Sequence, residues 1–360
     1  PRGESNLKFG NFANLLNIQL KKILLTGGTG YIGTHTAVVL TEAGYEVVLY
    51  DNLSNSKHSV LDRLETITGV QLPFIEGDVR DTTRLEKTLN DHNIDSVIHF
   101  AGLKAVGESV EKPIDYYENN VSGTISLIKA MCATKARTLV FSSSATVYGD
   151  PQCLPIGEQH PASATNPYGR CKLQIEEILA DVAKSDSNWH IASLRYFNPV
   201  GAHDSGLIGE DPNDIPNNLM PYIARVASGD LPYLNVYGND YATPDGTGVR
   251  DYIHVIDLAQ GHTAALHFLQ HKVGFHLFNL GTGKGYSVLE MIKAFEQASG
   301  KPIPYRISSR RAGDVATCYA KADKAATDLG WKATQTLHDM CASTWGFQKK
   351  TINGKLIRNG

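Results

Sequence analysis

The chain has 360 residues, of which 42% are hydrophobic and 20% are charged, a composition typical of a globular protein with a sizeable core and room for two domains. Its net charge of -3 and pI near 6.5 give no broad basic field, so we expect no nucleic-acid partner. The chain contains no run of roughly 18 uncharged apolar residues, so we expect no membrane span.

The cysteines and histidines predict neither a disulfide framework nor a metal centre. The 5 cysteines are scattered and form no Cys-x-x-Cys pair, and the 13 histidines include no His-Glu-x-x-His. We therefore expect a reduced, cytoplasmic protein without a metal. Residues 1–20 lack the charged start, apolar run and cleavage site of a secretory signal, so we interpret them as an N-terminal extension.

The first elements in chain order predict a βαβ unit: an apolar run at 23–25, a glycine turn, a helix from about 31 to 43 and a strand at 46–50. Short apolar runs then recur, separated by polar segments of helical crossover length, at 72–75, 96–100, 138–141 and 191–195. We predict an α/β fold whose first domain, residues 21–197, is a Rossmann-type doubly wound parallel sheet that binds a dinucleotide.

After Asn198 the periodicity loosens and Gly, Pro, Asn and Asp accumulate. We predict a smaller mixed α/β substrate-binding domain over residues 198–350, from which some segments return to the first domain. Residues 351–360 are expected to form a polar tail.

Gly27, Gly30 and Gly33 lie in TGGTGYIG, directly after the first strand and at the start of a helix. In that position glycines let backbone amides approach a pyrophosphate, and the helix N-terminus favours its negative charge, so the pattern predicts a nucleotide site rather than a purely structural turn. Asp51 ends the second strand, where a carboxylate binds ribose hydroxyls and repels a 2′-phosphate, which favours NAD over NADP. Asp78 follows a later strand and is either a contact to the adenine end or a solvated turn acid.

Tyr168 and Lys172 stand four residues apart in NPYGRCK, a spacing that puts both on one helical face. A neighbouring ammonium favours the phenolate, so we expect Lys172 to bring the pKa of Tyr168 down from its ordinary value of about 10. Chance can supply such a pair among 16 tyrosines, but Ser144 ends the strand before it, where open α/β sheets bind ligands. Tyr148 also follows the serines, yet its fourth following residue is Gln152, so Tyr168 is the better base.

At these residues the chain resembles the extended short-chain dehydrogenases/reductases, and most closely their UDP-glucose (UDP-galactose) 4-epimerase family, from about residue 21 to 349. The resemblance rests on a series of specific motifs: TGGTGYIG (26–33), HFAGLKAVGES (99–109), FSSSATVYG (141–149), LRYFNPVGA (194–202), PNNLMPYI (216–223) and DGTGVRDYIHV (245–255).

The resemblance implies NAD as a tightly held cofactor, because release of NADH would strand a half-oxidised intermediate. The positions expected to bind NAD, including the glycines of the turn, are Gly27, Gly30, Tyr31, Ile32, Gly33, Asp51, Asn52, Leu53, Ser54, Asn55, Ser56, Asp78, Val79, Phe100, Ala101, Gly102, Leu103, Lys104, Asn119, Tyr168, Lys172 and Phe197.

In the mechanism that the resemblance implies, the catalytic residues are Ser144, Tyr168 and Lys172. Tyr168 takes the proton of the sugar 4-hydroxyl, Ser144 hydrogen-bonds that oxygen, and hydride passes from C4 to NAD and back to the other face of a 4-keto sugar.

Arg250 and Arg311 suit phosphates through their planar guanidinium groups, whereas a lone arginine otherwise serves surface solubility. The positions expected to bind the UDP-sugar are Lys104, Ser144, Tyr168, Asn198, Asn218, Leu219, Asn235, Val236, Tyr237, Arg250, Arg311, Asp314 and Cys318.

Cys318 stands where several bacterial members of the family carry tyrosine, and the family pattern links a small residue there to room for a 2-N-acetyl group. We therefore expect activity on UDP-GlcNAc/UDP-GalNAc as well as on UDP-Glc/UDP-Gal. Otherwise Cys318 is a buried thiol acting as a small hydrophobe, and Tyr319 beside it leaves an alignment shifted by one residue open.

Two other functions are alternatives. An NAD-dependent sugar-nucleotide 4,6-dehydratase shares the first hydride step, but its family pattern has Asp-Glu directly after the serine/threonine, where this chain has Ala145 and Thr146. A non-catalytic NAD-binding regulator usually loses the Tyr/Lys pair that is present here. The resemblance also implies a homodimer joined through two helices per subunit, at about 113–133 and 161–183.

Overall fold

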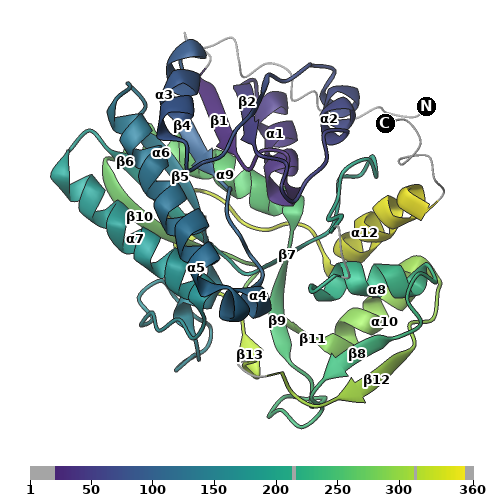
Figure 1. Ribbon diagram of the computed structural model, residues 1–360. Helices are drawn as coiled ribbons and strands as arrows, with labels where there is room; N and C mark the ends of the chain where they lie inside the picture. The colour runs from purple at the N-terminus through teal and green to yellow at the C-terminus, as the bar shows by residue number, and fades with distance from the viewer. Residues whose placement is uncertain (1–20, 213–215, 312–313, 353–360) are drawn as a thin grey trace, which may run out of the picture.

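The computed structural model describes residues 21–212, 216–311 and 314–352, and its main body is a parallel sheet between two layers of helices (Figure 1). The strand order is β10-β6-β5-β4-β1-β2-β3, and every neighbouring pair is parallel. Its strands are β1 (Lys22–Thr26), β2 (Glu46–Asp51), β3 (Phe74–Glu76), β4 (Ser96–His99), β5 (Thr138–Ser144), β6 (His190–Tyr196) and β10 (Gly274–Leu280). The strand order reverses between β1 and β4, and sheets of this kind bind ligands in the crevice at that reversal.

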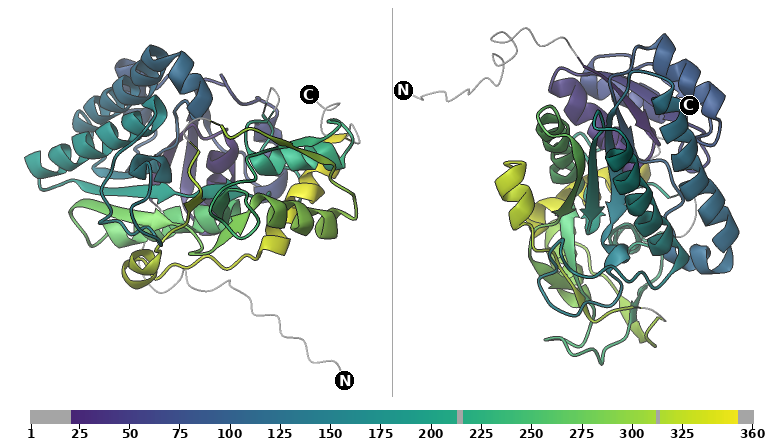
Figure 2. Two further views of the ribbon diagram at one scale, coloured as in Figure 1. Left: turned by 90° about the horizontal axis from the view of Figure 1, so that it is seen from below. Right: turned by 90° about the vertical axis from the view of Figure 1, so that its left-hand side faces the viewer.

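Both faces of the sheet are buried, which explains why 23–25 in β1 and 47–50 in β2 are apolar without alternation. In β1, Ile23 and Leu25 belong to the core on one face, whereas Leu24 belongs to the core on the other. Helices α1, α2, α9 and α11 contribute to the first core, and α3, α6 and α7 contribute to the second (Figure 2). These helices are α1 (Tyr31–Glu42), α2 (Val60–Thr68), α3 (Thr82–Asp91), α6 (Gly123–Cys132), α7 (Pro167–Ser185), α9 (Val255–Leu269) and α11 (Asp323–Asp328).

Shorter helical segments follow β4 and β5. They are α4 (Val106–Glu111), α5 (Pro113–Tyr116), a π-helical stretch (Tyr117–Ser122) that continues into α6, and a 3₁₀-helix (Ala145–Tyr148). A π-helical insertion is uncommon and often marks a functional region.

The second lobe is built around one central strand, β9 (Val249–His254). Its partners are β7 (Asn198–Val200), β11 (Gly285–Ser287) and β13 (Thr317–Cys318), and a separate parallel pair is formed by β8 (Leu234–Tyr237) and β12 (Tyr305–Ser308). A third core lies among α8 (Leu219–Ala227), α10 (Val288–Ser299) and α12 (Leu337–Ile352). Helix α10 starts with a capping box in which Ser287 and Glu290 satisfy each other's backbone N–H groups.

The predicted doubly wound sheet with a smaller mixed lobe is confirmed. From the second half of the chain, α9 and β10 pack in the first lobe. The helix expected over 161–183 begins only at Pro167, because Asn166 caps it by accepting the Gly169 N–H and proline suits the first turn. Helix α12 runs through Ile352, past the expected start of the tail, and the extension 1–20 and residues 353–360 lie outside the described residues.

Candidate active site

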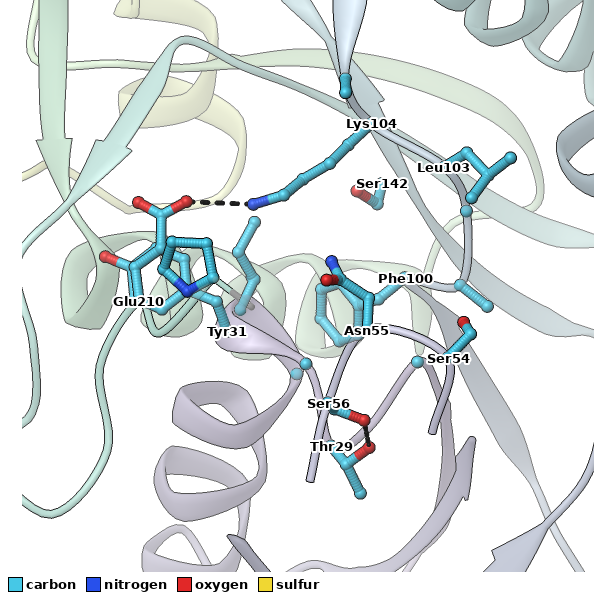
Figure 3. A pocket seen from close by; sticks show the side chains of 18 of the residues that line it. Thr29, Tyr31, Ser54, Asn55, Ser56, Phe100, Leu103, Lys104, Ser142 and Glu210 are labelled. Atoms are coloured by element: carbon cyan, nitrogen blue, oxygen red, sulfur yellow. Dashed lines mark hydrogen bonds and ion pairs between the residues drawn. The ribbon is translucent and has the colours of Figure 1, made fainter. Parts of the chain in front are cut away.

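A pocket of about 930 Å³ lies at the carboxyl edge of the parallel sheet, and residues from both lobes line it (Figure 3). Its walls come from the segments that follow β1, β2, β4, β5 and β6, together with residues 208–212 and 216–218. All the positions expected to bind NAD line it except Leu53 and Asp78. Of the positions expected to bind the UDP-sugar, those that line it are Lys104, Ser144, Tyr168, Asn198 and Asn218.

Gly27 and Gly30 lie in the turn between β1 and α1, Gly33 lies in the first turn of α1, and each is glycine for a different local reason. Gly27 has a φ of +69°, and a Cβ there would lie 2.6 Å from the Ala101 nitrogen, while a Cβ at Gly33 would lie 2.3 Å from the Gly27 oxygen. Gly30 caps α1 at an ordinary φ of -73°, and a Cβ there would meet only the Gly27 oxygen, at 3.3 Å. The protein's own packing therefore requires Gly27 and Gly33, whereas glycine at position 30 keeps the helix N-terminus open to the pocket.

Asp51, at the end of β2, organises the adjoining rim of the pocket. Its carboxylate accepts the backbone N–H groups of Thr29 (3.2 Å) and Leu53 (2.9 Å). The hydroxyls of Thr29 and Ser56 lie 2.7 Å apart, which ties the glycine turn to the segment after β2 (Figure 3). Leu53 itself adopts a left-handed φ of 58° and does not line the pocket.

Asp78 is held by its own neighbour. Arg80 donates Nε and Nη2 to the two carboxylate oxygens at 3.0 and 2.8 Å, and these hydrogen bonds lower the pKa of Asp78 to about 2. Asp78 does not line the pocket, whereas Val79 beside it does. The carboxylate is thus a turn acid in an ion pair in this structure.

Asn120, which the sequence reasoning did not single out, shapes the loop after β4. The Leu103 N–H donates to Asn120 Oδ1 at 2.8 Å, and Asn120 Nδ2 donates to the Leu103 oxygen at 2.9 Å. Asn119 Nδ2 also donates to Asn120 Oδ1, at 2.9 Å. The π-helical stretch therefore fixes the loop that carries Lys104, and two adjacent asparagines in a helical segment were the available signal.

Ser144, Tyr168 and Lys172 meet in the pocket from two elements. Ser144 ends β5 and accepts the N–H of Thr146 at 3.2 Å, while the other two lie one turn apart near the start of α7. Lys172 Nζ donates to the Ser142 oxygen at 2.5 Å and lies 5.8 Å from the centre of the Tyr168 ring. A phenol, a hydroxyl and an ammonium on neighbouring elements are the parts of a proton-transfer site.

The pKa values of Tyr168 and Lys172 differ from the sequence-based expectation. Burial raises the pKa of Tyr168 to about 12, and a hydrogen bond with Ser144 lowers it only in part. Burial also lowers the pKa of Lys172 to about 8. The expectation that Lys172 brings the phenol toward neutral pH is therefore wrong for the protein's own groups, because desolvation of the phenol is the largest influence on its pKa.

Tyr148, the other tyrosine near the serines, lies in a hydrophobic core cluster. Its hydroxyl donates to Asn279 Oδ1 at 2.6 Å, the side chain is fully buried, and the Arg195 guanidinium lies 4.6 Å from the centre of its ring. It does not line the pocket, whereas Tyr168 does.

Glu176, one turn beyond Lys172 on α7, is a second residue that the sequence reasoning missed. It forms a buried ion pair with Arg195 of β6, with contacts of 3.0 and 2.6 Å, and accepts the Ser143 hydroxyl at 2.6 Å. These contacts lock the helix that carries Tyr168 to strands β5 and β6. The i, i+4 spacing of three polar residues on one helix was the signal for it.

The remaining positions expected to bind the UDP-sugar lie in the second lobe, outside the pocket lining: Leu219, Asn235, Val236, Tyr237, Arg250, Arg311, Asp314 and Cys318. The Arg311 guanidinium lies 4.2 Å from the centre of the Tyr237 ring, and its Nε lies 3.7 Å from Asp314 Oδ2. Cys318 of β13 is in register with Arg250 of β9. The structure thus brings five of these eight residues together as two groups, a stacked Arg–Tyr–Asp set and an Arg–Cys pair.

The residues that the structure describes contain no group of three or more His, Cys, Asp or Glu side chains that could hold a metal ion. Within the same ranges, no helix combines the length and apolar character needed to cross a membrane.

The chain is similar to enzymes that act on sugar nucleotides over most of its length. A family model described as GDP-mannose 4,6 dehydratase matches residues 24–344, so the chain belongs to this class of sugar-nucleotide enzymes. A UDP-glucose 4-epimerase of Bacillus subtilis is 57% identical over 332 residues, which are 92% of this chain and 98% of that protein.

Solved structures agree with the sequence comparison. The UDP-glucose 4-epimerase of Stenotrophomonas maltophila, with bound NAD and formylated UDP-arabinopyranose, has a TM-score of 0.91 at 50% identity and covers 93% of this chain and 99% of its own. That of Bifidobacterium longum, in complex with NAD+ and UDP, has a TM-score of 0.90 at 56% identity and covers 93% and 100%. The chain is a member of the UDP-glucose 4-epimerase family.

Proposed function

We propose that the protein catalyses the reversible epimerisation of UDP-hexoses at C4, interconverting UDP-glucose and UDP-galactose with bound NAD. The observation that carries the proposal is the meeting of Ser144, Tyr168 and Lys172 in the same pocket as the glycine turn. Membership of the UDP-glucose 4-epimerase family supports the choice of substrate.

The pocket fits a dinucleotide. Gly30 has no side chain and so leaves the N-terminus of α1 open to a pyrophosphate. Asp51 suits an adenosine ribose, and the loop from Phe100 to Lys104, together with Asn119, suits the nicotinamide half. NAD, when bound, supplies the hydride acceptor and donor and, in its oxidised form, a positively charged ring.

Tyr168 moves the proton of the sugar 4-hydroxyl, and Ser144 orients the 4-oxygen. The hydrogen bond between these two residues favours the phenolate, but burial keeps the phenol protonated at neutral pH. The residues of this chain therefore place the Tyr168 phenol where a base is needed, and further positive charge is needed to ionise that phenol. Lys172 provides a nearby charge that the Ser142 carbonyl holds in place.

The UDP-sugar spans both lobes in this proposal. Lys104, Asn198 and Asn218 bind its sugar end within the pocket. Arg250 and Arg311 pair with its phosphates, and Asp314, 3.7 Å from Arg311 Nε, binds the hydroxyls of the uridine ribose. The 4-keto sugar turns over in the pocket between the two half-reactions.

A 4,6-dehydratase needs an acid to eliminate water, and the two residues after Ser144 are Ala145 and Thr146, neither of which carries a carboxylate. A non-catalytic regulator has no need of a Ser-Tyr-Lys set that lines the pocket. The dehydratase and regulator readings are accordingly not favoured.

A coupled assay with purified protein and all four UDP-sugars tests the proposal. We expect turnover of UDP-glucose and UDP-galactose without net production of NADH, and NAD should be recovered from denatured protein. Tyr168→Phe should abolish turnover while NAD stays bound. Near-normal rates in this variant would show that Tyr168 is not the base, and inactivity of the wild type on all four sugars would contradict the function.

We further propose that the acetylated pair UDP-GlcNAc/UDP-GalNAc is also turned over. Cys318 is half-buried and packs against a cluster that includes Phe197, which lines the pocket, so a small side chain here leaves room on that side. Cys318→Tyr should selectively abolish the acetylated reaction, with Cys153→Tyr, at an exposed thiol, as the matched control. Turnover of the unacetylated pair alone by the wild type would contradict this proposal.

We also propose a cytoplasmic homodimer. The five cysteines are free, as expected in a reducing compartment.

Val110 and Ile114 are 63% and 72% exposed on α4 and α5, which pack against α7, so this face supports a dimer joined through the expected helices. A monomeric mass by light scattering would contradict the dimer.

A further inference from the structure

Asp251, which follows Arg250 on β9, is a fully buried carboxylate that accepts four hydrogen bonds. Its Oδ1 accepts the N–H and the hydroxyl of Thr282, at 2.9 and 2.6 Å. Its Oδ2 accepts the N–H groups of Gly283 and Ala320, at 3.0 and 3.1 Å. A buried carboxylate is costly unless it is hydrogen-bonded, so the fold favours keeping these donors where they are.

The four donors belong to two segments that Asp251 ties together. Thr282 and Gly283 follow β10, the edge strand of the first-lobe sheet, whereas Ala320 follows β13 of the second lobe (Figure 1). Strand β13 ends at Cys318, two residues before Ala320. The carboxylate therefore fixes the end of the strand that carries this thiol.

The segment after β13 is also bound from its other side. Ile156, in the loop that follows the 3₁₀-helix, donates its N–H to the Tyr319 oxygen at 2.9 Å. The Ile156 oxygen accepts the N–H of Lys321 at 2.8 Å. The segment is thus held between β9 and a loop of the first lobe, and its position is defined by both.

Cys318 lies close to residues of the catalytic edge. It packs against a buried cluster that Ala145 also contacts, and Ala145 directly follows Ser144. Phe197, a member of this cluster, lines the pocket. The position of Cys318 therefore affects the space beside the sugar, and a misplacement of about 1 Å can lower a rate by about 10²-fold.

We propose that Asp251 is a positioning residue, whose carboxylate holds the segment after β13 so that Cys318 forms one wall of the sugar position. This inference rests on the proposed function, which puts the sugar beside Cys318. Asparagine in place of Asp251 has a single acceptor oxygen, and the shorter contacts with Thr282 should keep it. The amide NH2 would then face the N–H groups of Gly283 and Ala320, and because donors repel each other, the end of the segment should be released.

Asp257, on α9, provides a matched control. It is also fully buried, and its carboxylate accepts the Thr334 hydroxyl and the Gln335 N–H, each at 2.9 Å. Neither Thr334 nor Gln335 lines the pocket. Asp257→Asn should therefore disturb a comparable buried carboxylate without moving the wall of the sugar position.

Steady-state rates and calorimetry on NAD-loaded protein test the inference. Asp251→Asn should lower kcat/KM for UDP-galactose about tenfold, while the Kd for UDP, which has no hexose to place, stays within about twofold of the wild type. Asp257→Asn should leave both quantities within about twofold. An unchanged kcat/KM in Asp251→Asn, an equal loss in Asp257→Asn, or binding of UDP weakened about tenfold in Asp251→Asn would overturn the inference.

Hydrogen exchange at Ala320 follows the release of the segment independently of turnover. The Ala320 N–H should exchange about tenfold faster in Asp251→Asn and at the wild-type rate in Asp257→Asn. If Asp251→Asn does not fold, Thr282→Val, which removes only the hydroxyl donor, should lower kcat/KM about threefold, and an unchanged value would overturn the inference.

The outcomes separate the inference from the function on which it rests. Absence of turnover by the wild-type protein would overturn the proposed function together with the inference. Wild-type turnover combined with an unchanged kcat/KM in Asp251→Asn, or with an Ala320 N–H that stays protected in this variant, would overturn the inference alone.

Discussion

The ionisation of Tyr168 should depend on bound NAD, and removal of the cofactor is the perturbation that reveals it. Burial raises the pKa of this phenol to about 12, so at pH 7 only about one molecule in 10⁵ holds the phenolate through the protein's own groups. Half-ionisation at neutral pH requires a downward shift of about five units, which is about 7 kcal/mol of added stabilisation of the anion. Oxidised NAD, when bound, would add a positively charged ring to the charge that Lys172 supplies.

Tyrosinate absorbance, measured as the difference between the wild type and Tyr168→Phe, follows this titration directly. In cofactor-free protein the difference signal should stay flat up to about pH 10, and in NAD-loaded protein it should appear several units lower. Lys172→Met in cofactor-free protein should leave the signal flat as well, because burial of the phenol is the largest influence on its pKa. Titration of Tyr168 near neutral pH without NAD would refute this reasoning and restore Lys172 as the sufficient charge.

Three further substitutions test the site and its support. Ser144→Ala should lower kcat about 10²-fold with NAD still bound, since it removes one hydrogen bond to the reacting oxygen, and an unchanged kcat in steady-state assays would exclude it from the mechanism. Glu176→Gln leaves the Arg195 charge buried without its partner, so the free energy of unfolding in urea should fall by about 3–5 kcal/mol. The double variant Glu176→Gln/Arg195→Met should recover part of this loss. A loss below about 1 kcal/mol would contradict the buried pair. Gly33→Ala puts a Cβ 2.3 Å from a backbone oxygen and should lower the free energy of unfolding by about 1–3 kcal/mol, as followed by thermal unfolding. Gly346→Ala, whose Cβ has no neighbour within 4 Å, is the control and should leave the stability unchanged or raise it.

Much of the sheet and the nucleotide-binding edge could be predicted because their signals are local. The apolar runs of β1 and β2 reflect burial on both faces, and the glycine turn follows β1 at once, so strand, turn and helix could be read together. The start of α7 was also readable, since Asn166 followed by Pro167 is a cap and a first-turn residue, but the expected helix was begun six residues too early.

Other parts of the site depend on pairs that only the folded chain brings together. Arg195 comes 19 positions after Glu176 and Glu210 comes 106 positions after Lys104, so spacing along the chain does not indicate these contacts. The protonation of Tyr168 was also beyond reach, because the helix spacing indicates the neighbouring charge but not the depth of burial that outweighs it.

The origin of the hydrogen at C4 tests the central claim most directly. UDP-galactose incubated with the purified protein in D₂O should reach a mixture with UDP-glucose in which C4 retains its original hydrogen, as followed by proton NMR, because a hydride is removed and returned without exchange with solvent. Deuterium at C4 of either sugar would contradict the account and indicate that epimerisation proceeds by removal of a proton from carbon.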